Sequence, residues 1–300
     1  MGGGSWTATN YCSYNRSVGR SVSATTGEII GDYTAQSMFK QRHIHESLDP
    51  YKKTRECCDS DEHPETVPVI LALDVTGSMG SAAVEVARKL NVVMTELYGK
   101  VKDVEFMIMG IGDFKYDEAP LQVSQFESDI RIAEQLDSIW FEGCGGGNNY
   151  ESYTAAWYFA ANNTKLDCWK RGKKGIIITM GDEMINPYIP YVELNKHVGV
   201  FEQSNVETTK LYNEVSDKYD VFHLVVDHGG SSHYRVDENV RTFGNIIGQQ
   251  NVFVVDLDNI TKKITNIIID HANNDGFVVH TETADEVKSE SGFAMDTISW

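Results

Sequence analysis

The chain has 300 residues, of which 41% are hydrophobic and 23% charged, and its formal net charge is -18 at pH 7. This balance is typical of a globular protein, and the length suits one large domain or one ordinary domain with extensions. Because an acidic surface repels phosphate, the composition argues against nucleic acid and against an anionic membrane surface as partners.

The sequence also bears on where the protein resides. No apolar run approaches the ~18 residues that a membrane-spanning helix needs, and the first residues, MGGGSWTATNYCSYNRS, lack the apolar core of a signal peptide. The five cysteines are odd in number and irregularly spaced, which favours reduced thiols over a disulfide framework. We therefore expect a cytoplasmic protein.

Three regions differ in character along the chain. Residues 1–64 are polar and weakly periodic, and we interpret them as a partly ordered N-terminal extension that could wrap the domain, with a short helix near 33–42. Residues 65–273 carry the periodic apolar segments of a folded domain. Residues 274–300 are acidic and serine-rich, as in a C-terminal tail.

Apolar runs and amphipathic segments alternate within the predicted domain. Continuous apolar runs, typical of strands buried on both faces, lie at 67–74, 104–112, 175–179, 220–227 and 251–258. An alternating segment at 121–126 predicts an edge strand. Helical spacing is found at 82–99, 129–141, 153–163, 192–197, 206–218 and 259–274.

This alternation predicts an α/β fold with a doubly wound, mainly parallel sheet flanked by helices. Sheets of this kind bind ligands beyond the carboxyl ends of their strands, in the loops that follow them. The loops after the predicted strands are therefore the place to look for chemistry.

The loop after the first strand carries three side chains with oxygen atoms. Asp74, Thr76 and Ser78 are spaced i, i+2 and i+4, so in an extended turn their oxygens can converge on one point. Hard cations such as Mg²⁺ prefer oxygen ligands in octahedral array, and neutral hydroxyls leave the cation electrophilic toward an outside carboxylate. The alternative is a plain strand-to-helix turn in which Ser78 caps the next helix.

The segment LALDVTGSM resembles the DxSxS loop of the metal-ion-dependent adhesion site (MIDAS) of von Willebrand factor A (vWA) domains, with threonine in the middle position. Further along, FESDIRIAEQLDSIWFEGCGGGNNYES is similar to the second-loop region of the branch of that family that reads GGGDxPE. The resemblance covers about residues 68–273. It implies a Rossmann-like vWA fold that binds Mg²⁺ or Mn²⁺.

The resemblance implies that Glu151, after the glycine cluster, is the metal ligand of the second loop. Asn148 stands where the branch has Asp and is the substitute ligand, and Tyr150 stands where the branch has proline. Gly147 stands where the more common vWA pattern has threonine. The alternative is a flexible loop that places Glu151 at a helix N-terminus, where a carboxylate is favoured in any case.

The third loop departs from the family pattern. Most vWA domains read TDG here, with Asp as a water-mediated ligand, whereas this chain reads TMGDE at 179–183. Met180 occupies the Asp position, so we predict that Asp182 reaches the metal shell through a shift of the loop; otherwise it caps the next segment. Asp113, at the end of the second strand, is expected to end that strand rather than to support the site.

The N-terminal extension contains residue types that bind zinc, but their pattern does not favour a zinc site. The spacing of these residues matches no recognisable zinc module, and adjacent cysteines rarely bind one ion together. The residues are His43, His45, Cys57, Cys58 and His63.

Together, these patterns predict a protein-binding module that depends on a divalent cation, and no enzymatic activity. The protein would supply most of the ligands of Mg²⁺ or Mn²⁺, and an Asp or Glu of a protein partner would complete the coordination shell. The family resemblance further implies an intracellular multiprotein assembly, with an AAA+ ATPase or another assembly subunit as partner.

Two other functions stay open. A phosphatase of the haloacid dehalogenase type would use Asp74 as its nucleophile, but the simple phosphatases of that type carry a second Asp two residues later, where this chain has Thr76. A scaffold vWA domain with a non-functional metal site is suggested by Met180. Against it, Ser78 and Glu151 are retained along with Asp74 and Thr76.

Overall fold

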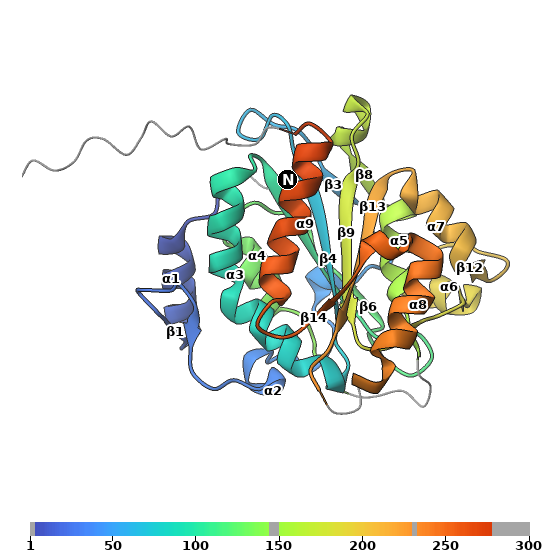
Figure 1. The fold of residues 1–300 in the computed structure, drawn as a ribbon, viewed down its shortest axis with the longest axis horizontal. Helices are drawn as coiled ribbons and strands as arrows, with labels where there is room; N and C mark the ends of the chain where they lie inside the picture. The colour runs from blue at the N-terminus through green and yellow to red at the C-terminus, as the bar shows by residue number, and fades with distance from the viewer. Residues whose placement is uncertain (1–3, 144–149, 230–232, 278–300) are drawn as a thin grey trace, which may run out of the picture.

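The structure is a computed structural model that describes residues 4–143, 150–229 and 233–277. Its centre is a six-stranded sheet (Figure 1). The strands are β4 (Val67–Asp74), β5 (Val104–Ile111), β6 (Leu121–Val123), β9 (Gly175–Gly181), β13 (Tyr219–Val226) and β14 (Val252–Val255).

Within the sheet the strand order is β14-β13-β9-β4-β5-β6. All neighbouring pairs are parallel except β5 and β6, which are antiparallel. Every residue of β4, β5 and β9 is buried, because helices cover both faces of these central strands. The predicted α/β class with a mainly parallel sheet is confirmed, and so is the edge strand predicted at 121–126.

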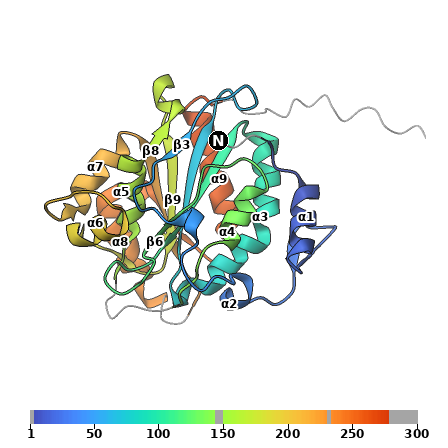
Figure 2. The same cartoon turned by 180° about the vertical axis from the view of Figure 1, so that it is seen from behind.

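Helices cover the two faces of the sheet, as Figures 1 and 2 show from opposite sides. One face carries α3 (Gly80–Lys100), α4 (Arg131–Asp137) and α9 (Ile260–Asn274). The other carries α5 (Tyr153–Asn163), α6 (Tyr191–His197), α7 (Thr208–Ser216) and α8 (Val236–Ile247). Among the described residues, no helix is both long and apolar enough to cross a membrane.

Helix α8 is absent from the elements that we predict from the sequence. Its first turn carries Asp237 and Glu238, which favour a helix N-terminus. Asn239, Phe243 and Ile247 are spaced by four residues and are buried. The buried positions therefore have helical spacing, but only two of these three residues are apolar, so the apolar pattern alone does not predict the helix.

Residues 4–64 pack against the domain and share its core. Several of their apolar side chains, including Tyr11, Met38 and Phe39, are almost fully buried. The elements of this segment are α1 (Ala8–Ser17), β1 (Ser21–Val22), β2 (Ile29–Ile30), α2 (Ala35–Met38), η1 (Glu46–Leu48) and β3 (Arg55–Cys57). Helix α2 lies within the helix expected near 33–42. Of the predicted tail, residues 278–300 lie outside the described residues.

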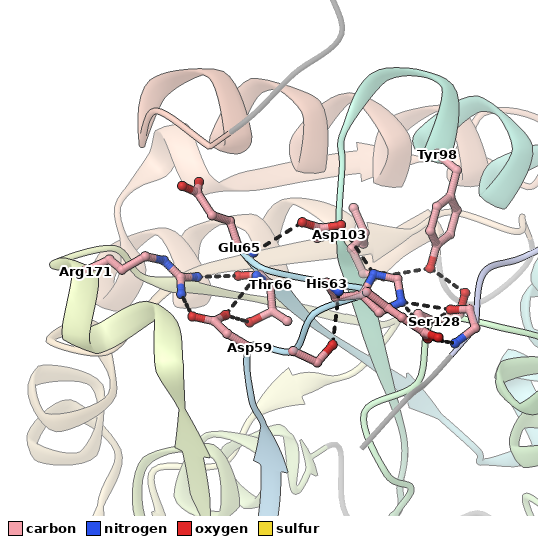
Figure 3. A network of polar contacts seen from close by, with 12 residues as sticks. Asp59, His63, Glu65, Thr66, Tyr98, Asp103, Ser128 and Arg171 are labelled. Carbon is pink, nitrogen blue, oxygen red and sulfur yellow. Dashed lines mark hydrogen bonds and ion pairs between the residues drawn. The ribbon is translucent and has the colours of Figure 1, made fainter.

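A buried polar network, drawn in Figure 3, fastens this segment to the end of the sheet where β4 and β5 begin. His63 Nε2 lies 2.8 Å from the carbonyl oxygen of Gly4, and His63 Nδ1 lies 3.3 Å from Asp103 Oδ1. The Ser128 hydroxyl donates to the same Gly4 carbonyl at 2.7 Å. Both ring nitrogens of His63 are thus engaged in holding the segment.

Shorter elements complete the fold. They are η2 (Gly77–Met79), β7 (Tyr150–Glu151), β8 (Thr164–Leu166), η3 (Asp167–Arg171), β10 (Met184–Ile185), β11 (Tyr188–Ile189), β12 (Val206–Glu207), η4 (His233–Arg235) and η5 (Gln249–Asn251). Strand β8 pairs in parallel with β3, and β7 pairs in parallel with β10. The cysteines within the described residues, at positions 12, 57, 58 and 168, are free thiols.

Substitution of two valines of the sheet compares how much its central and its edge strands contribute to the free energy of unfolding. Val69 in β4 is fully buried, whereas Val254 in the edge strand β14 is 50% exposed. Val69→Ala is expected to lower the free energy of unfolding by about 2 kcal/mol, and Val254→Ala by about 0.5 kcal/mol or less. Urea unfolding followed by circular dichroism measures both, and equal losses would contradict this placement of the core.

Candidate metal centre

The predicted site residues lie where the central parallel strands end. Asp74 is the last residue of β4, and Asp182 follows the last residue of β9. In the sheet register Asp74 faces Ile111 of β5, and Leu73 faces Met180 of β9. The loops after β4, β5 and β9 therefore meet at one edge of the sheet.

In the first loop, Asp74 is fully buried and organises its own turn. Asp74 Oδ1 accepts hydrogen bonds from the Thr76 backbone N–H at 2.9 Å and from the Thr76 hydroxyl at 2.5 Å. Burial raises the pKa of Asp74 to about 7, and the nearby charge of Asp182 adds to this, while the bonds from Thr76 act in the opposite direction.

Ser78 links the first loop to the third. It is exposed, and its hydroxyl donates to Asp182 Oδ1 at 2.9 Å. No side chain caps α3 or η2, so Ser78 does not serve as the helix cap of the plain-turn alternative. Its hydroxyl instead lies at the solvent-facing side of the candidate centre.

In the third loop, Asp182 and not Met180 lies next to the first loop. Met180 is fully buried in β9 and belongs to the core, whereas Asp182 lies beside Ser78. His228 Nε2 lies 3.0 Å from Asp182 Oδ2, and the Asn239 side chain donates to the Asp182 carbonyl at 2.7 Å. Both partners come from distant parts of the chain, and the sequence patterns do not point to either of them.

Tyr153, at the start of α5, is a further residue that the sequence does not single out. It is fully buried, and its hydroxyl donates to Asp74 Oδ2 at 2.9 Å. The hydroxyl reaches this position because residue 181 is a glycine: a Cβ atom on Gly181 would overlap it. With Thr76 on the other oxygen, both oxygens of Asp74 accept hydrogen bonds.

Glu151 differs from Asp74 because one of its oxygens has no partner. It is 4% exposed, lies in β7 opposite Ile185, and its Oε2 atom is buried without a hydrogen bond. Burial raises the pKa of Glu151 to about 11, and the charge of Asp74 is the next largest cause. Asn148 and Gly147 lie outside the described residues.

A buried carboxyl group with an unpaired oxygen requires either a proton or a cation. Around Glu151 the candidate donors are carboxylates and hydroxyls, a set that suits a hard cation such as Mg²⁺. The carboxylates of Asp74, Glu151 and Asp182 do not all lie within 4.8 Å of one another. One cation would therefore contact at most two of these carboxylates directly and reach the third through water, with the hydroxyls of Thr76 and Ser78 as further ligands.

A second acidic group lies at the opposite end of the sheet. Among the described residues, Asp220, His271 and Asp275 form the group of acidic and histidine side chains whose ligand atoms do lie within 4.8 Å of one another. His271 Nδ1 is 3.0 Å from Asp220 Oδ2, and Nε2 is 3.2 Å from the carbonyl oxygen of Lys174. Since both ring nitrogens have partners, this group joins α9 to the starts of β9 and β13.

Two hollows flank the candidate centre. One of about 300 Å³ lies between α2 and the start of α3, with Gln36 and Gly77 among its lining residues. The other, of about 250 Å³, is lined by Asp113, Tyr150 and Tyr188 among others. The N-terminal segment thus borders the first loop, and exposed tyrosines border the second.

No family model matches the chain, and no curated protein matches it. Among solved structures, the pilus adhesin SpaC from Lactobacillus rhamnosus GG, in its open conformation, matches 75% of this chain with a TM-score of 0.50 and 15% sequence identity. This chain covers 31% of the length of SpaC. The likeness shows a shared fold and nothing finer.

Two further structures match with lower TM-scores. The vWF domain of the type V pili tip protein Mfa5 from Porphyromonas gingivalis has a TM-score of 0.43 and 13% identity, and the match covers 73% of this chain and 98% of that one. Proximal thread matrix protein 1 from the mussel byssus has a TM-score of 0.40 and 11% identity, with 72% and 49% covered. The metal site and the GGGDxPE branch stay predictions.

Gly181→Ala is expected to destabilise the protein by about 1–3 kcal/mol, because the new methyl group displaces the Tyr153 hydroxyl from Asp74. Gly99→Ala is the matched control, since a Cβ atom there meets nothing within 4 Å inside helix α3. The control should leave the stability unchanged or raise it slightly. Thermal unfolding compares the two variants, and equal melting temperatures would contradict the close packing at Gly181.

The raised pKa values predict how stability depends on pH without divalent cations. Burial raises the pKa of Asp74 from 3.8 to about 7 and that of Glu151 from 4.5 to about 11. Because the folded state holds these protons more tightly than the unfolded state, each group destabilises the fold as pH rises above its unfolded value. The free energy of unfolding in EDTA should therefore fall between about pH 5 and about pH 7 by on the order of 1 kcal/mol per pH unit for each of the two groups. Above pH 7 the contribution of Glu151 alone should continue to fall, toward its folded pKa of about 11.

Urea unfolding across this pH range measures the slope. Glu151→Gln keeps the shape of the side chain and cannot ionise, so it should flatten the slope. A wild-type stability that rises with pH, or a slope that Glu151→Gln leaves unchanged, would contradict the burial of these two acids as the cause.

Proposed function

We propose that the chain is a protein-binding module that depends on a divalent cation. In it, Mg²⁺ or Mn²⁺ is held by Asp74, Thr76, Ser78, Glu151 and Asp182 and coordinates an Asp or Glu of a partner protein. The observation that carries the proposal is the buried carboxyl group of Glu151, whose unpaired oxygen lies in a site that also contains the buried Asp74.

When Asp74 and Glu151 lose their protons, another positive charge has to stabilise the two buried carboxylates. Ionised Asp74 and Glu151 repel one another in a site that water barely reaches. A divalent cation supplies positive charge between the carboxylates and Lewis acidity toward an outside oxygen. Asp74 is positioned by Thr76 and Tyr153, so the first loop is ordered before any ligand arrives.

Exposure indicates the side from which a partner approaches. Asp74 and Thr76 are buried, whereas Ser78 is exposed, so the open side of the centre faces solvent at Ser78. The surrounding protein is strongly acidic, which favours a partner that offers one carboxylate within a neutral or basic surface. Tyr150 and Tyr188, 39% and 42% exposed, offer aromatic contact area next to the centre.

We further propose that the module works inside the cell. Its free thiols at the described positions suit a reducing compartment such as the cytoplasm. The family resemblance is the support for an intracellular multiprotein assembly and for an AAA+ ATPase or another assembly subunit as partner.

An enzymatic role of the haloacid dehalogenase type is disfavoured by the residue two positions after Asp74. Simple phosphatases of that type carry a second Asp there, whereas this chain has Thr76, whose hydroxyl donates to Asp74 Oδ1. A scaffold with a non-functional metal site is the other candidate. It is disfavoured by the unpaired oxygen of Glu151, which such a site would have no reason to keep buried.

Calorimetric titration of Mg²⁺ into EDTA-treated, dialysed protein tests the module. The wild type is expected to bind Mg²⁺, and Asp74→Ala should abolish binding at this centre because it removes a buried ligand group. Glu151→Ala should weaken it by at least about tenfold. The matched control is Asp217→Asn, an exposed acid at the end of α7, which should bind as the wild type does. Binding that is absent from the wild type, or indifferent to both site variants, would refute the metal-dependent mechanism.

A further inference from the structure

Beside the candidate centre, the turn after β5 holds two more buried carboxyl groups. Asp113 is 5% exposed and Asp117 is 9% exposed. The Asp113 backbone N–H donates to Asp117 Oδ2 at 2.7 Å, and the Lys115 backbone N–H donates to Asp113 Oδ1 at 2.7 Å. The other oxygen of each group, Asp113 Oδ2 and Asp117 Oδ1, is buried and has no hydrogen-bond partner.

Hydrogen bonds join this turn to the segment that carries Glu151. The Ser152 backbone N–H donates to the carbonyl of Gly112 at 3.3 Å, and the Phe114 backbone N–H donates to the Ser152 hydroxyl at 3.1 Å. Glu151 Oε2 is a third buried carboxylate oxygen without a partner. Three unpaired oxygens from two adjoining loops therefore lie in one region of the protein.

Nothing in the described part of the chain neutralises these three acids. No Lys, Arg or His there forms an ion pair with Asp113, Asp117 or Glu151. Lys115, the nearest basic residue in the sequence, has its ammonium group 5.1 Å from the centre of the Tyr116 ring. The acids also affect one another, because the charges of Asp117 and Asp113 contribute to the raised pKa of Glu151.

We propose that Asp113 and Asp117 hold a second, hydrated Mg²⁺ ion, with Glu151 between this ion and the first centre. The proposal goes beyond the protein-binding module, since the second ion would bind without a partner. Asp113 Oδ2 and Asp117 Oδ1 are its direct ligands, and Glu151 is reached through water.

The spacing of the acids selects the kind of ion. Asp113, Asp117 and Glu151 do not form a group whose oxygens all lie within 4.8 Å of one another, so they cannot enclose a dehydrated ion together. Mg²⁺ commonly keeps several of its waters and takes only one or two carboxylates directly. The burial of the two aspartates raises the cost of leaving them unneutralised, which favours an ion that is retained.

The ion would also act on the first centre. A positive charge next to Glu151 favours its ionised form, which is the form that binds metal. It would also hold the 112–118 turn in place, and this turn contributes Asp113, Phe114 and Lys115 to the lining of the 250 Å³ hollow.

The test counts Mg²⁺ ions bound by the full chain, using equilibrium dialysis with metal analysis. The wild type is expected to bind two ions per chain. Asp113→Asn/Asp117→Asn keeps the oxygen acceptors of the turn but removes its charge, and it should bind one. Asp74→Asn should lose the first ion and keep the second. The control Glu118→Gln, at an exposed acid of the same turn, should bind two.

Each outcome decides between the two sites. One ion in the wild type, lost in Asp74→Asn and kept in the double variant, overturns the second site and leaves the binding module intact. Two ions that both survive in the double variant also overturn it, whereas no ion in the wild type overturns both proposals. If the double variant does not fold, the single variant Asp117→Asn replaces it, and it should weaken one of the two ions at least tenfold; unchanged binding of both overturns the proposal.

Discussion

The burial of several carboxyl groups at one end of a parallel sheet is the constraint on which this structure depends. Asp74, Glu151 and Asp182 are each less than 5% exposed, in a setting where like charges strongly disfavour one another. The protein offsets this cost with donors on most of the oxygens: Thr76 and Tyr153 for Asp74, and Ser78 and His228 for Asp182. Among these three acids, the buried oxygen without a donor is Glu151 Oε2, and it marks the candidate metal centre.

The rest of the fold serves to hold this arrangement. The parallel register brings the ends of β4, β5 and β9 to one edge, and the aromatic contacts of Tyr153 with His223 and Phe243 anchor the side chain that reaches Asp74. The N-terminal segment adds its own cover on the α3 side (Figure 1). A site built from rigid strand ends is one that a ligand finds largely preformed.

Sequence patterns predict the features of this protein that depend on residues close together in the sequence. The apolar runs of β4, β5 and β9 and the i, i+2, i+4 oxygens of the first loop are visible without tertiary information. Tyr153 and His228 are not, because only the folded chain brings them to Asp74 and Asp182. Asp182 is an intermediate case, because the sequence shows an acid in the third loop but not which residue it contacts. Met180 continues β9, and the carboxylate two residues later accepts a hydrogen bond from Ser78, which is 104 positions away in the sequence.

Anomalous diffraction from crystals grown with Mn²⁺ tests the central claim most directly, because it locates the cation without relying on its effect on stability. We predict a peak at the carboxyl ends of β4 and β9, within coordination distance of Ser78 and Glu151. Crystals that show no peak there, or that show Mn²⁺ only at the Asp220, His271 and Asp275 group at the opposite end of the sheet, would contradict the account.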